Sequence, residues 1–188
     1  YFNVRMNVNN LDIYEGAKYD AYAGGYVYRM QHALCTVGTS GYHGGAHGGS
    51  GGGNSNGNPI ACGNFKKPTY MGAGSYSYSN GGGALQLHVA QNLWVNGTVD
   101  VRGQAGCAGG AGGSILVYAD DITGMGKFDA SGGDYGCGGY GGGGGGRIGI
   151  HSKTSTFQGT MIAPGGYGAT SYSGGAGSVY TEIGWNIV

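Results

Sequence analysis

The sequence predicts an all-β fold, a right-handed parallel β-helix with glycine-rich return segments and about 31 residues per circuit. Two observations carry this prediction: short apolar strands recur at a nearly constant spacing, and glycine-rich runs, without intervening helices, connect them. We expect a single domain over residues 1–188, as part of a longer protein or filament. Residues 26–80 are expected to be an irregular glycine-rich insertion within that domain.

Four similar segments begin successive circuits. They are ALQLHV from Ala84, SILVYA from Ser114, RIGIHS from Arg147 and SVYTEI from Ser178. Their starts are 30, 33 and 31 residues apart (114−84, 147−114 and 178−147). A second short strand follows each of the first three: GTVDVRG from Gly97, GKFDASGG from Gly126 and GTMIAPGG from Gly159. Each circuit therefore contains two strands and a glycine-rich return.

The N-terminal stretch follows the same rule. Val4, Met6 and Val8 alternate with polar residues as the apolar residues after Ala84 do, and GAKYDAYAGG from Gly16 resembles GMGKFDASGG from Gly124. About 80 residues separate this first circuit from the next, which is why residues 26–80 are predicted to be an insertion along one side of the solenoid.

Alternation within the strands divides side chains between an inward and an outward face. The inward set from the first strands is Val4, Met6, Val8, Leu85, Leu87, Val89, Ile115, Val117, Ala119, Ile148, Ile150, Val179 and Ile183. The second strands add Tyr19, Ala21, Val99, Val101, Phe128, Ala130, Met161 and Ala163. This coherent inside indicates a packed core.

Glycine supplies 48 of the 188 residues, including the run GGGGGG at residues 141–146. The clustered apolar strands and 16 tyrosines argue against a disordered chain. In a β-helix, returns of neighbouring circuits stack backbone on backbone, where a Cβ would clash. The alternative is a bundle of polyproline II helices, which we disfavour because the apolar strands break the three-residue glycine period that such a bundle requires.

Charge and motifs exclude several functions. Nine basic residues balance nine acidic ones, so the basic excess of a nucleic-acid binder is missing. No apolar run is long enough for a membrane span. The glycine runs match neither GxxxxGK[ST] nor a strand–GxGxxG–helix pattern, and GxSxG is absent, so no cofactor is expected. The first residues show neither an initiator methionine nor the layout of a signal peptide, which indicates a mature or partial chain.

Four cysteines, Cys35, Cys62, Cys107 and Cys137, are present without a CxxC motif. Their even number and the glycosylation sequon Asn96-Gly97-Thr98 favour an extracellular location. Cys107 and Cys137 occupy equivalent places in successive returns, so stacking predicts a Cys107–Cys137 disulfide. A Cys35–Cys62 disulfide is predicted to close the insertion, and free buried thiols are the alternative in both cases.

Two outward columns carry polar groups. Asp20, Asp100 and Asp129 align, and they are candidates for catalysis, for calcium or for a solvated face neutralised by Lys18 and Lys127. His88, Tyr118, His151 and Glu182 form the second column, for which a stacked surface or a contact with a neighbouring chain is favoured over a metal site. His43 and His47 have the spacing of helical zinc ligands but lie in a loop, so no metal site is expected there.

A resemblance supports the repeat. AHGGSGGG (46–53), GGGALQLHVAQNLWVNGTVDVRG (81–103), GGAGGSILVYADDITGMGKFDASGG (109–133) and GGGGGGRIGI (141–150) resemble glycine-rich repeat arrays of large extracellular proteins of protists, algae, oomycetes and some bacteria. Some stramenopile flagellar-hair (mastigoneme) proteins carry regions that look similar. The resemblance covers residues 41 to about 170 and implies β-helical surface or appendage proteins, with no catalytic residue to transfer. The chain departs from it in Tyr135, Cys137, Tyr140 and Tyr167, which fit a cross-linked or aromatic-contact surface.

Together these features predict a structural subunit of an extracellular filament, cell-surface appendage or matrix, and not an enzyme. The exposed first and last strands are expected to be continued either by more of the same chain or by head-to-tail neighbours, which would be further copies or related proteins. A glycan on Asn96 is a further expected partner. The alternatives are a carbohydrate-binding module that uses tyrosines and Trp94, or a β-helix polysaccharide-degrading enzyme that uses Asp100 and Asp129.

Overall fold

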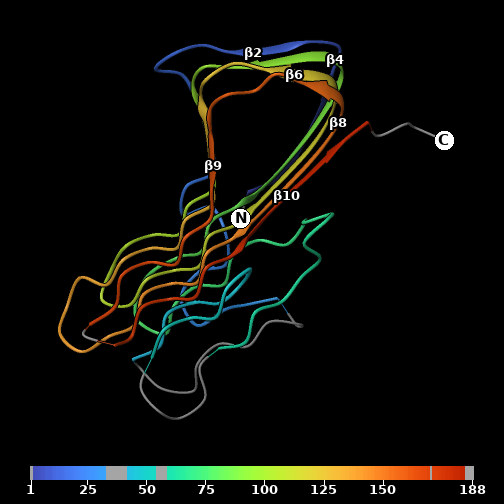
Figure 1. The fold of residues 1–188 in the computed structure, drawn as a ribbon. Helices are drawn as coiled ribbons and strands as arrows, with labels where there is room; N and C mark the ends of the chain where they lie inside the picture. The colour runs from blue at the N-terminus through green and yellow to red at the C-terminus, as the bar shows by residue number, and fades with distance from the viewer. Residues whose placement is uncertain (1, 33–41, 54–58, 170, 185–188) are drawn as a thin grey trace.

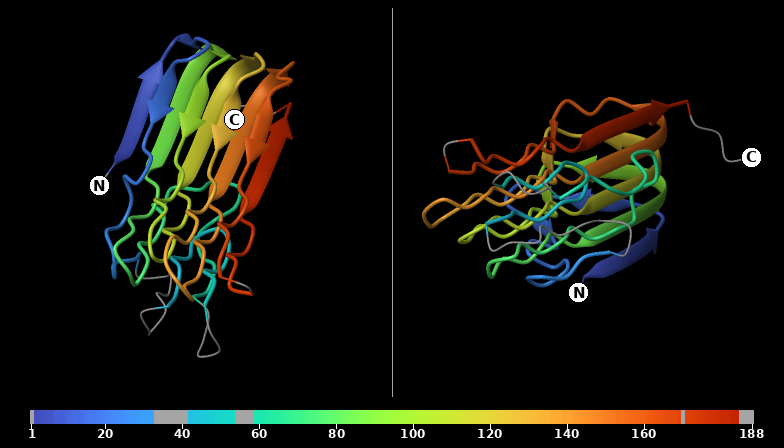
Figure 2. Two further views of the ribbon diagram at one scale, coloured as in Figure 1. Left: turned by 90° about the vertical axis from the view of Figure 1, so that its left-hand side faces the viewer. Right: turned by 90° about the horizontal axis from the view of Figure 1, so that it is seen from below.

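The computed structural model describes residues 2–32, 42–53, 59–169 and 171–184. Within these ranges the chain forms strands and no helix, and every strand pairing is parallel. The predicted all-β parallel β-helix is therefore confirmed. Figure 2 shows the circuits stacked in chain order from β1 to β10.

Two parallel sheets make the walls of the solenoid (Figure 1). The larger sheet has the order β1 (Asn3–Val8), β4 (Ala84–Val95), β6 (Ser114–Thr123), β8 (Arg147–Ser155) and β10 (Ser178–Ile183), with β2 (Leu11–Ile13) also paired to β4. The smaller sheet has the order β3 (Lys18–Asp20), β5 (Thr98–Asp100), β7 (Lys127–Asp129) and β9 (Thr160–Ile162). The circuits that begin with β4, β6 and β8 contribute one strand to each sheet, whereas the first contributes β1 and β2 to the larger sheet and β3 to the smaller one.

The register agrees with the alignment made from the sequence. Ala84 pairs with Ser114, Ser114 with Arg147 and Arg147 with Ser178. Val4 lies beside Leu85, so the N-terminal stretch is the circuit before β4 in space despite the long insertion between them.

The strands of the larger sheet continue beyond their predicted ends. In β4 the register shifts between Val89 and Asn92, so that Ala90 and Gln91 together face the single residue between Ala119 and Asp121 of β6. Such a bulge bends the strand. After it, Leu93 and Val95 are fully buried and extend the core to the turn before β5.

The apolar core lies between the two sheets and consists mainly of the predicted inward residues. Leu87, Val117 and Phe128 are completely buried, and the Phe128 ring meets Phe157 edge-on, with 5.3 Å between centroids. At the ends the same inward positions are exposed: Val4 is 37% exposed and Ile183 is 63% exposed. The core is thus open at both ends of the stack within the described residues.

The glycine-rich returns form a third layer below the sheets, in which hydrogen bonds repeat every three residues. In the run 141–146, successive N–H groups donate in turn to three neighbouring chain segments. N–H groups three residues apart therefore donate to the same segment. The pairs are Gly141 to Tyr42 and Gly144 to Gly45, Gly142 to Tyr172 and Gly145 to Gly175, and Gly143 to Gly133 and Gly146 to Ala130. Three residues per turn is the period of a polyproline II helix.

Close packing on several sides explains why glycine fills consecutive positions and not only every third one. A Cβ on Gly144 would overlap the carbonyl oxygen of Gly49, and one on Gly145 would overlap that of Ala163. The prediction of a β-helix over a polyproline II bundle holds for the chain as a whole, because apolar strands interrupt the glycine runs. Within each run, however, the hydrogen bonds follow the three-residue period of a polyproline II helix, which we did not predict.

The described parts of residues 26–80 contain no strand and are built into this layer. Gly45 donates to Gly109, and Gly49 donates to Gly145, so the segment lies between returns of later circuits. Another part of it crosses the outer face of the larger sheet, where the Tyr70 carbonyl accepts a hydrogen bond from Ser114 (2.6 Å). The insertion therefore does more than lie along one side of the solenoid.

Candidate functional sites

A column of rings stands on the outer face of the larger sheet. His88, Tyr118 and His151 are neighbours in register on β4, β6 and β8, and their ring centroids are 4.9 and 4.8 Å apart. The Tyr118 and His151 planes are within 15° of parallel. The structure thus brings together the predicted column as a stack of rings, with Asn7 and Glu182 at its two ends.

His151 is held by hydrogen bonds on both ring nitrogens. Nδ1 lies 2.9 Å from Glu182 Oε2, and Nε2 lies 2.7 Å from the carbonyl oxygen of Lys66. Burial, followed by the charge of Arg5, lowers the pKa of His88. Across the described ranges, no group of three or more His, Cys, Asp or Glu side chains is placed to hold a metal ion.

An open groove of about 650 Å³ lies beside this ring column. Its walls include Asn7, Asn9, His88, Tyr118, Asp120 and Lys153. Lys153 Nζ forms an ion pair with Asp120 at 2.8 Å. The His88 ring contacts Tyr118 on one side, with the planes inclined by 39°, while the shorter Asn7 is its neighbour on the other, so the ring column ends at the β1 end of the groove.

The aspartate column ends the strands of the smaller sheet. Each of the three aspartates accepts a hydrogen bond from the backbone N–H two residues later, which is an Asx turn. The donors are Tyr22 for Asp20, Arg102 for Asp100 and Ser131 for Asp129. In the fourth circuit Ile162 replaces the aspartate, and the residue two positions later is Pro164, which has no N–H to satisfy.

The candidate catalytic carboxylates Asp100 and Asp129 are engaged in ion pairs. Asp100 is fully buried and receives Arg102 in a two-pronged contact, and Lys18 approaches to 3.8 Å. Burial alone would raise the pKa of Asp100, but the hydrogen bonds and charge of Arg102, with the charge of Lys18, lower it overall. Asp129 is paired with Lys127 at 2.6 Å. Of the readings left open, the geometry favours neutralised structural carboxylates.

From the sequence we predicted that Lys18 and Lys127 neutralise the aspartates, but we did not predict the contact between Arg102 and Asp100. The signal was available, because residues two apart on a strand face the same side and Arg102 follows Asp100 by two.

His43 and His47 are completely buried in the glycine layer. His47 Nδ1 lies 2.9 Å from the Gly112 carbonyl oxygen. Burial lowers the pKa of His47 to about 4, with a partly opposing effect of the Gly112 hydrogen bond and a further lowering by the charge of Arg147. A Cβ on Gly53 would overlap the His43 ring. These histidines are packing residues of the layer, a role that sequence reasoning missed.

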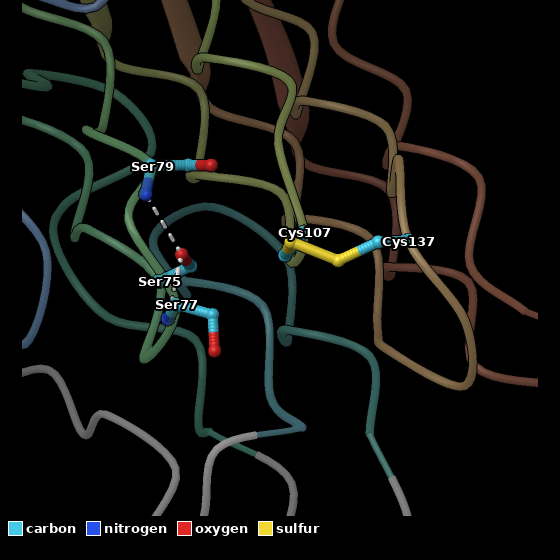
Figure 3. The surroundings of a disulfide bond; sticks show 5 residues. All are labelled: Ser75, Ser77, Ser79, Cys107 and Cys137. Atoms are coloured by element: carbon cyan, nitrogen blue, oxygen red, sulfur yellow. Dashed lines mark hydrogen bonds between the residues drawn. A yellow bond between two sulfur atoms is a disulfide. The ribbon is translucent and has the colours of Figure 1, made fainter.

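The predicted Cys107–Cys137 disulfide is confirmed. It joins successive returns (Figure 3), with 4.6 Å between the Cα atoms. Gly106 and Tyr135 of the same returns form a parallel bridge. The turn that carries Ser75, Ser77 and Ser79 lies close by in the same view. The predicted Cys35–Cys62 disulfide involves Cys35, which lies outside the described residues.

The sequon residue Asn96 lies in the turn between β4 and β5 and is half-buried. Its Oδ1 accepts a hydrogen bond from the Met125 N–H of the next circuit (2.9 Å). Since that bond uses the oxygen, the side-chain nitrogen, to which a glycan would be attached, is not needed for it.

No helix long and apolar enough to cross a membrane occurs in the described part of the chain. Comparison of the chain with protein-family models, with curated proteins and with solved structures gives no match.

Proposed function

We propose that this protein is a structural subunit of an extracellular filament, cell-surface appendage or matrix, in which β-helices join end to end. The observation that carries the proposal is the open stack. In the described chain β1 and β10 pair on one side only, as do β3 and β9 of the smaller sheet. Unpaired strand edges are templates for further pairing.

Apolar side chains are exposed at these two edges of the described chain. Val179 and Ile183 of β10 are 44% and 63% exposed, whereas Ile148, beside Val179 on the preceding strand, is completely buried. Val4 of β1 is 37% exposed, whereas its neighbour Leu85 is 2% exposed. Another circuit at either end would remove this apolar surface from water.

The internal register defines how a second copy would continue the stack. If β1 of that copy follows β10 as β10 follows β8, the matched positions are Val179 with Val4, Thr181 with Met6 and Ile183 with Val8. Arg5 then falls opposite Tyr180, and Glu182 lies two residues farther along, so opposite charges become diagonal neighbours. The joint therefore combines apolar continuity with complementary charge.

The edge strands β1, β3, β9 and β10 contain no proline that would prevent pairing with another strand. The three prolines, Pro59, Pro68 and Pro164, all lie outside β1, β3, β9 and β10. Proteins that avoid edge association place proline, inward charges or bulges at such edges.

A disulfide and a sequon support the proposed extracellular location. Disulfides persist in oxidising compartments. The Cys107–Cys137 bond links neighbouring circuits, so it would also resist their separation under tension. The proposed modification of Asn96 would place a glycan at the turn between the two sheets.

Thr181 offers a selective test of the joint. The N–H groups of Ser178 and Gly184 donate to Gly146 and Ser152 of the preceding circuit. Because alternate residues of a strand direct their N–H groups to opposite sides, those of the odd-numbered residues, Thr181 among them, point to the open side. Thr181→Pro should therefore block onward pairing without removing an internal hydrogen bond. Sedimentation velocity over a range of concentrations should show head-to-tail oligomers of the unmodified chain and monomers of the variant.

Met125→Lys is the matched control, because Met125 is 73% exposed but lies in a turn away from the open edges. Oligomers that persist in Thr181→Pro, or an unmodified chain that stays monomeric at high concentration, would overturn the proposal.

The groove supports a second candidate, the binding of a saccharide. Aromatic rings next to amide groups provide the apolar faces and hydrogen-bonding groups that sugars require. His88 and Tyr118 supply the rings, and Asn7 and Asn9 the amides. Addition of cellohexaose or chitohexaose should change the nuclear magnetic resonance chemical shifts of these four residues. The changes should disappear in the Asn9→Ala variant. No shift with either probe contradicts this candidate.

A further inference from the structure

Two tyrosine rings meet where the 26–80 segment begins and ends. The rings of Tyr28 and Tyr78 have centroids 5.3 Å apart and planes inclined by 36°. Tyr28 is 45% exposed and Tyr78 is 78% exposed. The pair is therefore in contact and open to solvent.

The backbone holds both rings in place. The Ser77 and Ser79 N–H groups donate to Ser75 Oγ at 3.2 Å, and the Arg29 N–H donates to the Ser75 carbonyl at 2.8 Å. These bonds tie the turn that carries Tyr78 to the segment that carries Tyr28. The pair is thus fixed by the fold and does not depend on ring contact alone.

Local strain points to the same place. Arg29 and Tyr78 have positive φ angles of 62° and 63°. Residues other than glycine seldom adopt this conformation, and they do so where the surroundings dictate it, often at functional positions. The Arg29 guanidinium also lies 4.4 Å from the Tyr76 ring centroid and 6.0 Å from that of Tyr28, which adds cation–π contacts.

We propose that Tyr28 and Tyr78 are a site of oxidative cross-linking. A peroxidase with hydrogen peroxide removes one electron and the phenolic proton from each ring. The two phenoxyl radicals join through ring carbons ortho to oxygen, and the hydrogens on those carbons are lost as the phenol O–H bonds re-form. Overall two hydrogen atoms leave the protein, and one hydrogen peroxide becomes two waters.

Proximity makes this coupling selective. Two rings already in contact react in an effectively unimolecular step, whereas isolated tyrosines must meet by diffusion. Tyr42 and Tyr140 form a second pair of tyrosines in contact, at 5.1 Å, and are expected to react in the same way. Tyr167 is 76% exposed but is in none of the ring contacts found among the described residues.

The consequence is a covalent staple at the base of the 26–80 segment. This segment contributes no strand in its described parts, and hydrogen bonds of the glycine layer hold it. A Tyr28–Tyr78 bond would close it independently of those hydrogen bonds. The inference does not depend on end-to-end assembly, since both residues belong to one chain.

The test treats dilute, disulfide-intact protein with horseradish peroxidase and hydrogen peroxide, followed by proteolysis and mass spectrometry. The expected product is a linked pair of peptides that contain Tyr28 and Tyr78, with a mass two hydrogens below their sum. It should exceed any linkage to Tyr167 by about tenfold or more. Tyr78→Phe should abolish the linked pair, whereas Tyr167→Phe should leave it unchanged.

The same oxidation in denaturant shows whether the fold provides the selectivity. Loss of the preference for Tyr28–Tyr78 on unfolding supports the proposal. Equal yields with and without denaturant, or products dominated by intermolecular linkages through Tyr167, overturn it. Tyr78 is so exposed that its phenylalanine variant should fold, which circular dichroism can verify.

Discussion

Arg102 holds the carboxylate of Asp100 with two nitrogens, Nε at 2.9 Å from Oδ1 and Nη2 at 2.7 Å from Oδ2. Asp100 is completely buried, while the Arg102 side chain is 42% exposed. The pair lies at the end of β5, where the same carboxylate also caps the backbone. It therefore connects the smaller sheet to the returns.

Asp100→Ala should lower the free energy of unfolding by about 3 kcal/mol, because it breaks a buried ion pair and an Asx turn together. Urea denaturation at pH 7 measures this change. Asp120→Ala is the control: that residue pairs with Lys153 at the surface, so the loss should stay below about 1 kcal/mol. Similar losses in both variants would contradict the assigned role of Asp100.

Stability should fall as the pH drops from about 6.5 to 4 because of His47. Its pKa is about 4 in the folded chain but about 6.5 when unfolded, so the unfolded state alone takes up a proton in this window. The loss amounts to about 3 kcal/mol by pH 4, and nothing is lost above pH 6.5. Urea denaturation as a function of pH measures it.

His47→Gln should remove most of the loss of stability between pH 6.5 and 4, whereas His88→Gln, at a half-exposed site, should leave most of that loss in place. The Asp100 carboxylate adds a further loss at lower pH: its folded pKa is lowered, so its contribution disappears as the pH falls below about 4. A profile of His47→Gln that still falls steeply between pH 6.5 and 4 would contradict the assignment to His47.

Gly144→Ala should destabilise the protein by about 3 kcal/mol or more, because its Cβ would overlap the Gly49 carbonyl oxygen in a layer without room to relax. Gly138→Ala should change stability by less than about 0.5 kcal/mol, since nothing lies within 4 Å of its Cβ position. Thermal denaturation of the two variants compares them directly. Equal melting temperatures would refute the close packing of the returns.

Reduction of the Cys107–Cys137 disulfide, or its replacement by two serines, should cost about 3–4 kcal/mol, as expected for a loop of 30 residues. For this test Cys35 and Cys62 are replaced both in the serine variant and in the protein that keeps Cys107 and Cys137. The serine variant should then unfold at the same denaturant concentration with or without reductant. A stability unaffected by the serine substitutions would show that the bridge does not constrain the unfolded chain.

The strand circuits could be predicted because alternating apolar residues, such as Leu85 and Leu87, recur about every 31 residues along the chain. The ring column followed from the same register, since outward residues such as His88 and Tyr118 align whenever the inward ones do.

The glycine layer was less predictable. The partners of Gly144, for example, include Gly45 and Gly49, which lie almost a hundred residues earlier, and no local pattern relates them. The extension of β4 was missed because the bulge after Val89 interrupts the alternation that predicts a strand. His47 lies in a loop as predicted, but its burial could not be predicted because it depends on the packed layer around it.

The most direct test of the central claim, that β10 of one copy pairs with β1 of the next, uses two single-cysteine additions. One chain carries Asn3→Cys and the other Ser178→Cys, at positions that the internal register would place side by side at a joint. Stacked strands bring Cα atoms to about 5 Å, within disulfide range.

On mixing and mild oxidation, the account predicts a covalent dimer that contains one chain of each kind, well in excess of dimers of either chain alone, and no such excess when Met125→Cys replaces Ser178→Cys. Mixed dimers no more abundant than the like pairs would contradict it.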